Sequence, residues 1–219
     1  MNKAILFDLD GTLLDREKSV RHFVDDQFNR LKPSFGHVRK SAYVHSFLKL
    51  DDRGYVWKDK VYQQMVEEFD ITMITWQELL EDYVTNFYKS CIPFPNLIET
   101  LDQLACYGYK MGIITNGKDP FQMNNIRALH IENYLDTILI SEKEKLKKPD
   151  PLLFQRGLKQ LGVQASEAFF VGDHPKNDIE AAHKVGMQTI WKRTDYENVP
   201  KADFIIDDLH EILDIITGP

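Results

Sequence analysis

Pairs of polar residues follow several short apolar segments of the sequence, and their types suit phosphoryl chemistry. The pairs are Asp8 with Asp10, Thr115 with Asn116, Lys147 with Lys148, and Asp173 with Asp178. Three or four carboxylates brought to one place would repel one another and raise at least one pKa unless a cation lay between them. A hard divalent ion with oxygen ligands, above all Mg²⁺, removes that conflict. Together with a lysine, such a metal would attract a dianionic phosphate group.

The spacing of Asp8 and Asp10 suits covalent catalysis followed by proton transfer. The Asp8 carboxylate, held beside a cation, could attack phosphorus and form an aspartyl-phosphate. Asp10 lies two residues on and therefore on the same side of an extended chain, where it could protonate the leaving oxygen and later activate water. Thr115 and Asn116, with nearby backbone N–H groups, could bind the transferring phosphoryl oxygens, while Lys148 offsets the charge that develops.

Buried parallel strands are the elements that would bring these residues together. Short apolar runs without alternation are typical of strands covered on both faces. Such runs span residues 3–7, 110–115, 137–140, 168–171, 188–191 and 203–206. From residue 110 onward they alternate with helical patterns, which predicts a doubly wound, Rossmann-like α/β fold with a parallel sheet. Ligands of such sheets bind at the carboxyl ends of the strands, where the polar pairs fall.

The segment from residue 15 to 91 has a different, all-helical pattern. Apolar residues recur there at helical spacing in about four stretches, and Thr75 with Glu78 forms a capping-box pattern. Because the strand at 3–7 cannot be stable alone, we interpret this segment as an insertion. The sequence therefore predicts an all-helical cap domain at 15–91 and an α/β core domain formed by residues 1–14 and 92–219.

Two finer expectations concern helix starts and aromatic side chains. In the core domain, Asn96 and the pair Asp150-Pro151 are expected to begin helices. Six aromatic residues of the insertion are expected to form its hydrophobic core rather than a ligand site. They are Tyr43, Phe47, Trp57, Tyr62, Trp76 and Tyr83.

Four motifs resemble, in this order, those of the haloacid dehalogenase superfamily. They are Asp8-Leu-Asp-Gly-Thr12, Thr115-Asn116-Gly117, Lys148-Pro149 and Gly172-Asp173 with Asp178. The resemblance covers the whole core and implies a Rossmann-like fold whose helical cap is inserted between the first and second motifs. Lys148 is preferred to Lys147 because it precedes Pro149, as the lysine of that family precedes its proline.

The resemblance also implies roles for individual residues. Asp8 is the expected nucleophile and Asp10 the expected general acid/base. Magnesium is expected to be held by the Asp8 carboxylate, the Asp10 main-chain carbonyl and Asp173. Asp178 would support the water shell of the metal, and Thr12 would lie behind the ligands. The implied activity is that of a Mg²⁺-dependent phosphatase acting on a small phosphorylated metabolite such as a sugar phosphate, phosphoglycolate or a nucleoside monophosphate.

The composition argues against several other classes. The formal net charge of −7 disfavours binding to nucleic-acid polymers and acidic membranes, which are polyanions. No segment reaches the ~18 consecutive apolar residues of a membrane span. Two cysteines are too few for a disulfide framework. These features favour a cytoplasmic protein whose partner is a small phosphorylated metabolite, and no protein partner can be inferred.

Several alternative functions fit parts of the same pattern. A haloacid dehalogenase would use Asp8 but would need neither Asp10 nor magnesium. A phosphomutase of the β-phosphoglucomutase type shares every motif, whereas a phosphonatase would need a lysine in the cap, and none stands out. A signalling module phosphorylated on aspartate belongs to another class, but such receiver modules are shorter and lack the helical insertion. A catalytically silent binding protein need not retain every acid and lysine position.

Overall fold

Six short apolar segments form the strands of one parallel sheet. The computed structural model describes residues 4–195 and 199–218. The strands are β1 (Ala4–Phe7), β2 (Lys110–Thr115), β3 (Thr137–Ile140), β4 (Ala168–Gly172), β5 (Gln188–Lys192) and β6 (Phe204–Ile206). Every residue of β1 and β4 is buried, which explains why both read as unbroken apolar runs. The predicted α/β fold is confirmed, and Lys3 lies outside the described residues.

The order of the strands places β1 and β4 side by side in the middle of the sheet. The order is β3-β2-β1-β4-β5-β6, and each pair of neighbours is parallel. Ile5 of β1 pairs with Met111 on one side and with Phe169 on the other. In this order the direction of winding reverses between β1 and β4, so a crevice opens beyond their carboxyl ends. Asp8 and Asp173 directly follow these two strands.

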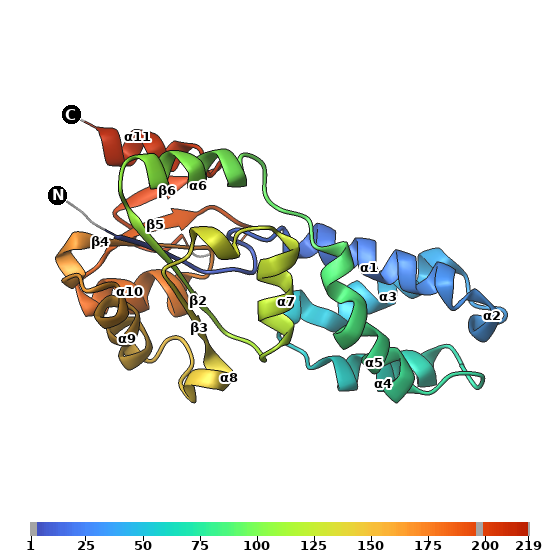
Figure 1. Cartoon of the computed structure of the whole chain (residues 1–219). Helices are drawn as coiled ribbons and strands as arrows, with labels where there is room; N and C mark the ends of the chain where they lie inside the picture. The colour runs from blue at the N-terminus through green and yellow to red at the C-terminus, as the bar shows by residue number, and fades with distance from the viewer. Residues whose placement is uncertain (1–3, 196–198, 219) are drawn as a thin grey trace. The chain divides into compact units, whose positions relative to one another are not determined.

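Helices cover both faces of the sheet (Figure 1). One face carries α6 (Leu97–Cys106) and α11 (Glu211–Thr217), and the other carries α9 (Pro151–Leu161) and α10 (Ala181–Val185). Between α9 and the sheet, buried Phe154 packs edge-on against Phe170 with ring centroids 5.0 Å apart. The shorter α7 (Phe121–Ala128) and α8 (Ser141–Glu144) follow β2 and β3.

The starts of two helices differ in how well the sequence predicted them. The Asp150 side chain accepts a hydrogen bond from the Leu152 amide, and Pro151 occupies the first turn of α9, as expected. Asn96 directly precedes the first residue of α6, as expected, but it does not cap that helix with its side chain. Its backbone is left-handed (φ 61°) and its side chain makes no cap, because its amide donates instead to Asp208 at 2.9 Å.

Residues 16–92 contain helices and no strand within the part of the chain that the structure describes. The helices are α1 (Arg16–Arg30), α2 (Lys32–Phe35), α3 (Lys40–Asp51), α4 (Lys58–Glu68) and α5 (Trp76–Asn86). Four are long, as predicted, and α2 is one additional turn. The capping box at Thr75 and Glu78 is present at the start of α5.

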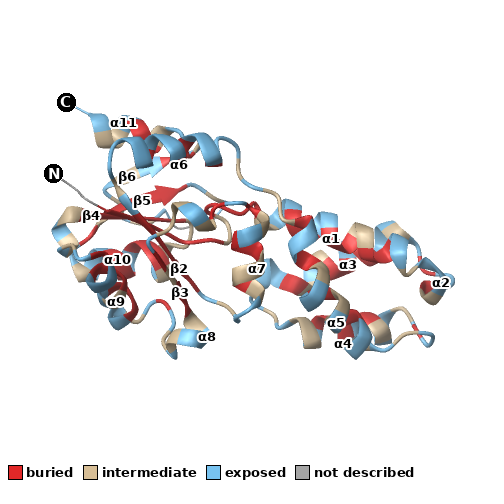
Figure 2. Ribbon diagram, in the orientation of Figure 1, coloured by how far each residue is buried: buried red, intermediate tan, exposed pale blue. Residues whose placement is uncertain are grey.

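Aromatic rings form the core of these helices, whose buried stripes are red in Figure 2. Tyr43, Phe47, Tyr62 and Tyr83 are buried, and the ring of Phe47 lies 5.3 Å from that of Tyr62. Trp57 contradicts the expectation, because its residue is 62% exposed. It directly precedes α4, where the chain has left the helical stripe that faces the core.

Contacts within the chain divide it into two compact units. Unit 1 consists of Met1–Asp15 and Pro93–Pro219, and unit 2 is Arg16–Ile92. That unit 2 acts as a cap stays a prediction, to which the proposed function returns. None of the helices in the described residues is both long enough and apolar enough to span a membrane.

Candidate active site

A tight turn after β1 holds the first pair of carboxylates. Asp8 is buried, and its amide donates to the carbonyl of Val171 in β4 at 2.9 Å. The chain then folds back. The Leu9 carbonyl accepts hydrogen bonds of 2.9 to 3.3 Å from the amides of Thr12, Leu13 and Leu14. Gly11 has a φ of 86°, a left-handed conformation that glycine adopts without steric cost. The sequence therefore fixes Asp8 at the sheet and turns Asp10 away from it.

The ammonium group of Lys148 lies between two carboxylates. Its Nζ is 2.5 Å from Asp8 Oδ1 and 2.7 Å from Asp178 Oδ1, and all three side chains are at least nine-tenths buried. Burial lowers the pKa of Lys148, but the carboxylates of Asp178 and Asp8 outweigh it, and the net pKa is raised. Lys147 is exposed. Of the two lysines considered from the sequence, Lys148 is the one that the structure places among the acids.

Three carboxylates gather at the carboxyl ends of β1 and β4. Oxygens of Asp8, Asp173 and Asp178 lie within 4.8 Å of one another. Burial raises the pKa of Asp8 to about 7, although Lys148 partly opposes this and Asp178 adds to it. Burial, followed by the charges of Asp178 and Asp8, also raises the pKa of Asp173 well above its ordinary value.

This donor set fits a divalent cation. Hydrogen bonds within the described part of the chain leave the Asp173 carboxylate unpaired, while Asp178 uses one oxygen for Lys148 and the other for the amide of His174 at 2.9 Å. Asp8 has its second oxygen left over. Two crowded carboxylates with open oxygens are the ligands that Mg²⁺ prefers. Asp178, expected from the sequence only to support the water shell of the metal, contributes a carboxylate oxygen to the same cluster as Asp8 and Asp173.

Asp10 does not join the cluster with its carboxylate. Its Oδ2 instead accepts a hydrogen bond of 2.6 Å from Gln122 Nε2, and the same nitrogen donates to Thr115 Oγ1 at 2.7 Å. Thr115 is buried at the end of β2. Buried Thr12 follows the turn, and its hydroxyl has no hydrogen-bond partner among the described residues.

The side chain of Asn116 connects β2 to the lysine loop. Its Nδ2 donates to the Lys148 carbonyl at 3.0 Å, and its Oδ1 accepts from the Lys148 amide at 2.8 Å. This two-point link fixes the backbone from which the Lys148 ammonium reaches Asp8. The expected contact of Asn116 with phosphoryl oxygens stays a prediction, since the side chain already spends two of its polar groups on Lys148.

Two residues that shape the site were missed by sequence reasoning. Gln122 lies on α7, and the only signal for it was a polar side chain on a helix that follows the Thr115 loop. His174 directly follows Asp173, and its Nδ1 accepts hydrogen bonds from the amides of Lys176 and Asn177 at 3.1 Å. It thereby caps the π-helical turn Pro175–Glu180, which carries Asp178.

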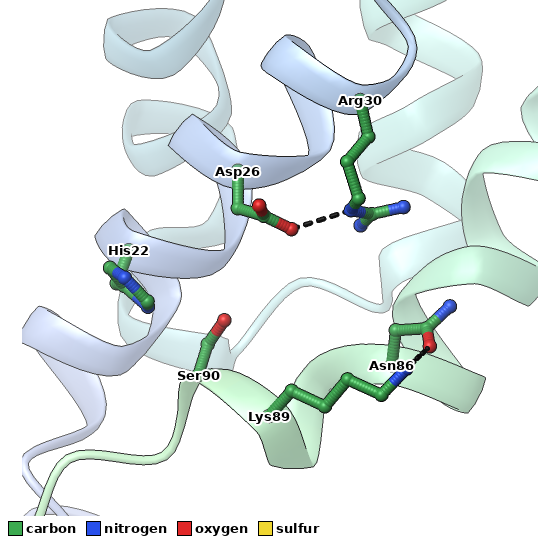
Figure 3. Close-up of a pocket in the computed structure, with 6 residues that line it drawn as sticks. All are labelled: His22, Asp26, Arg30, Asn86, Lys89 and Ser90. Atoms are coloured by element: carbon green, nitrogen blue, oxygen red, sulfur yellow. Dashed lines mark hydrogen bonds and ion pairs between the residues drawn. The ribbon is translucent and has the colours of Figure 1, made fainter.

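Unit 2 has a polar pocket of its own (Figure 3). It is lined by His22, Asp26, Arg30, Asn86, Lys89 and Ser90. Arg30 is paired with Asp26 and Asp82, whereas the Lys89 ammonium donates to the neutral amide of Asn86. The pocket contains none of the site residues predicted from the sequence.

A doubly wound parallel sheet with acidic residues and a lysine at its switch point defines a class of Rossmann-like α/β enzymes. The family of haloacid dehalogenase-like hydrolases matches residues 5–192, and the chain belongs to this family. The resemblance expected from the four motifs is thus confirmed.

Relatives of known activity include phosphatases and a dehalogenase. The glyceraldehyde 3-phosphate phosphatase of Pyrococcus furiosus is 35% identical over 98% of this chain and 92% of its own length. The phosphoglycolate phosphatase of Yersinia pestis is 30% identical over 86% of this chain and 79% of its own length. The (S)-2-haloacid dehalogenase 4A of Burkholderia cepacia is 28% identical over 86% of this chain and 81% of its own length.

Solved structures agree with the fold. A phosphatase of the same superfamily from Thermococcus onnurineus superimposes with a TM-score of 0.69 at 29% identity, covering 99% of this chain and 98% of that one. A hydrolase from Bacillus subtilis, bound to magnesium, reaches a TM-score of 0.80 at 20% identity over 99% of both chains. The second likeness supports the fold alone, since its identity is low.

Proposed function

We propose that this hydrolase is a Mg²⁺-dependent phosphatase that acts on a small phosphorylated metabolite through an aspartyl-phosphate on Asp8. The observation that carries the proposal is the buried cluster in which Lys148 contacts Asp8 and Asp178 while Asp173 faces the same space. A dianionic phosphate would meet a nucleophile, a fixed ammonium group and a cation site there. Its charge would be offset as it moves to the nucleophile.

In the first half of the reaction, an Asp8 carboxylate oxygen attacks phosphorus. The phosphorus–oxygen bond to the alcohol breaks, and the departing oxygen takes a proton from the Asp10 carboxyl. The alcohol leaves, and the phosphoryl group remains on Asp8 as an acyl phosphate. Lys148, held by Asn116, stays beside the reacting oxygen throughout.

In the second half, Asp10 acts as a base. It takes a proton from water, and the water oxygen attacks phosphorus. The bond between phosphorus and the Asp8 oxygen breaks, which releases inorganic phosphate and restores both carboxyl groups. A bound Mg²⁺, held by Asp8, Asp173 and the Asp10 carbonyl, would neutralise the carboxylates and polarise a phosphoryl oxygen.

The activities of two relatives support a proposal for the substrate class. Two of the relatives act on two- or three-carbon phosphate esters, glyceraldehyde 3-phosphate and phosphoglycolate. We place these two esters first among the candidate substrates, ahead of larger sugar phosphates and nucleoside monophosphates. Unit 2 is proposed to act as a cap that closes during phosphorylation, excludes water and selects the substrate.

The direct experiment is a screen of phosphorylated metabolites, with 4-nitrophenyl phosphate as the general probe, in the presence of Mg²⁺ or EDTA. We expect hydrolysis only with the metal, and we expect Asp8→Asn and Asp10→Asn each to abolish it. Asp102→Asn, which changes an exposed carboxylate on α6, is the matched control and should keep full activity. Undiminished turnover in either site variant would reject the mechanism.

The dehalogenase relative supplies the discriminating control. A dehalogenase would release halide from a 2-haloacid through Asp8 without needing Mg²⁺ or Asp10. We therefore expect no halide release from (S)-2-chloropropionate. A phosphomutase would transfer the phosphoryl group to a second sugar phosphate rather than to water, and incubation in ¹⁸O-water distinguishes the two, because only hydrolysis places ¹⁸O in inorganic phosphate. Replacing residues 16–92 by another helical cap should change the ranking of substrates.

A further inference from the structure

Gln122 is a buried amide that contacts two separate parts of the site and belongs to none of the four motifs. It is 2% exposed and lies on α7, which belongs to unit 1. Its Nε2 donates one hydrogen to Asp10 Oδ2 at 2.6 Å and the other to Thr115 Oγ1 at 2.7 Å. Both hydrogens of the amide are therefore used within the site.

The orientation of this amide is fixed by its neighbours. An ionised carboxylate can only accept hydrogen bonds, so the NH₂ group must face Asp10. The opposite end, Oε1, accepts from Asn125 Nδ2 at 3.2 Å, which locks the side chain from the helix side. Beneath its stem lies Gly117, where an added Cβ would sit 2.6 Å from Gln122 Cγ. Only glycine at position 117 leaves room for the amide to reach Asp10.

We propose that Gln122 is the positioning residue for Asp10. By bonding to both side chains, Gln122 holds the Asp10 carboxylate near Thr115, so that Asp10 can transfer protons to the leaving oxygen and from water. Because Thr115 Oγ1 accepts from Gln122, the hydroxyl proton of Thr115 is left available to donate to a phosphoryl oxygen. One amide thus sets the spacing between the acid/base and a phosphoryl-binding group. This inference rests on the proposed phosphatase function and deepens it.

The expected consequence is a defect in one half of the reaction. Gln122→Met has nearly the same shape but cannot donate. With 4-nitrophenyl phosphate, the leaving 4-nitrophenolate needs no proton, so phosphorylation of Asp8 should proceed at close to the wild-type rate. Hydrolysis of the aspartyl-phosphate still needs Asp10 as base and should slow by about 10- to 100-fold, the range expected for misplacing a catalytic group by about 1 Å.

Stopped-flow kinetics under Mg²⁺ separate these steps. We expect Gln122→Met to show a burst of close to one 4-nitrophenolate per active site, a slow steady state and a KM that does not rise. With phenyl phosphate, whose leaving group needs a proton from Asp10, Gln122→Met should also slow the phosphorylation of Asp8 and therefore show no burst. Gly117→Ala, which pushes on Gln122 from below, should reproduce the pattern. Ile126→Val, a buried change on the same helix, is the control and should keep wild-type kinetics.

A double-mutant cycle tests whether Gln122 acts through Asp10. In the Asp10→Asn background, which has no steady-state turnover, Gln122→Met should leave the slow spontaneous loss of the trapped aspartyl-phosphate unchanged, because the group that it positions is gone. The proposal is overturned if Gln122→Met turns over at the wild-type rate, if burst and steady state fall together, or if the two changes add. If the wild-type enzyme itself releases no 4-nitrophenolate with Mg²⁺, the proposed phosphatase function fails instead.

Discussion

The carboxylate of Asp173 lies directly over the α-carbon of Gly11. A Cβ built on Gly11 would sit 2.5 Å from Asp173 Oδ2 and 2.8 Å from its Cγ, which is closer than real atoms approach. The loop after β1 and the loop after β4 are therefore in van der Waals contact, and a side chain at residue 11 would push them apart. Glycine at position 11 therefore leaves room for the Asp173 carboxylate of the candidate cation site, and it adopts the left-handed backbone without steric cost.

We expect Gly11→Ala to weaken Mg²⁺ binding by at least about tenfold, since misplacing a group that supports a metal site has effects of that order. It should also lower the free energy of unfolding by more than the backbone cost of a left-handed alanine, which is roughly 1–2 kcal/mol. Gly108→Ala is the matched control, because Gly108 has a φ of 77° but no atom within 4 Å of its added Cβ. Isothermal titration with Mg²⁺ and urea unfolding check the difference. Equal Mg²⁺ affinity in the two variants would contradict the contact.

Asp173→Asn should make the metal-free protein more stable while removing its response to magnesium. The raised pKa of Asp173 means that the folded protein disfavours its ionised form, so a neutral amide relieves that repulsion. We expect a gain on the order of 1 kcal/mol, or about 2–4 °C in Tm, in EDTA. Wild-type protein should gain about 2.7 kcal/mol when Mg²⁺ is at 100 times its Kd, and the variant should gain far less. Thermal unfolding with and without Mg²⁺ measures both, and a lower Tm for the variant in EDTA would count against a repulsive cluster.

The residues at the strand ends were predictable because of a general property of parallel sheets. Unbroken apolar runs located β1 and β4, and the carboxyl ends of neighbouring parallel strands must share one edge. This brought Asp8 together with Asp173, which are 165 positions apart in the printed sequence. The helical segment at 15–91 was equally visible, since its helical spacing differs from the short apolar runs on either side.

What the sequence could not show was which side chain pairs with which. The contact of Gln122 with Asp10 depends on where α7 packs, and the hydrogen bond from Asn116 to Lys148 depends on the path of the loop that carries Lys148. Neither is encoded in a spacing rule. Asn96 is a second example. Its residue type is suited to capping a helix, but its side chain bonds instead to Asp208, which is distant in sequence.

Unit 2 depends on a buried ion triad, and this predicts how it responds to acid. Asp51 accepts two hydrogen bonds from Arg16, at 2.9 and 3.1 Å, and also pairs with Lys58. Burial alone would raise the pKa of Asp51, but Arg16 and Lys58 outweigh it and hold the pKa below its ordinary value. Asp51→Asn would leave two partly buried cations without their partner. We expect it to lower the free energy of unfolding by roughly 3 kcal/mol at pH 7.

The pH dependence has a definite sign. A carboxyl whose pKa is lowered by folding contributes its stability above the pKa of the unfolded chain, and that contribution disappears as the pH falls through the folded pKa. The difference between wild type and Asp51→Asn should therefore be constant from neutral pH to about pH 5 and shrink below about pH 4. Urea unfolding across this range tests it. Asp25→Asn breaks the exposed pair with Lys40 and should change stability by less than about 1 kcal/mol; a loss as large as that of Asp51→Asn would show that burial is not the cause.

Neighbouring lysines offer the sharpest comparison within the site. Lys148→Met removes the ammonium group between Asp8 and Asp178 and leaves a side chain of similar length. The two carboxylates then face each other without compensation, and the charge on a transferring phosphoryl group has no fixed cation beside it. We expect kcat for 4-nitrophenyl phosphate to fall by about 10²- to 10³-fold. Lys147→Met changes the preceding, exposed lysine and should leave kcat unchanged. Similar losses of kcat in both variants would mean that positive charge in this loop in general, rather than the contact of Lys148 with Asp8, supports the reaction.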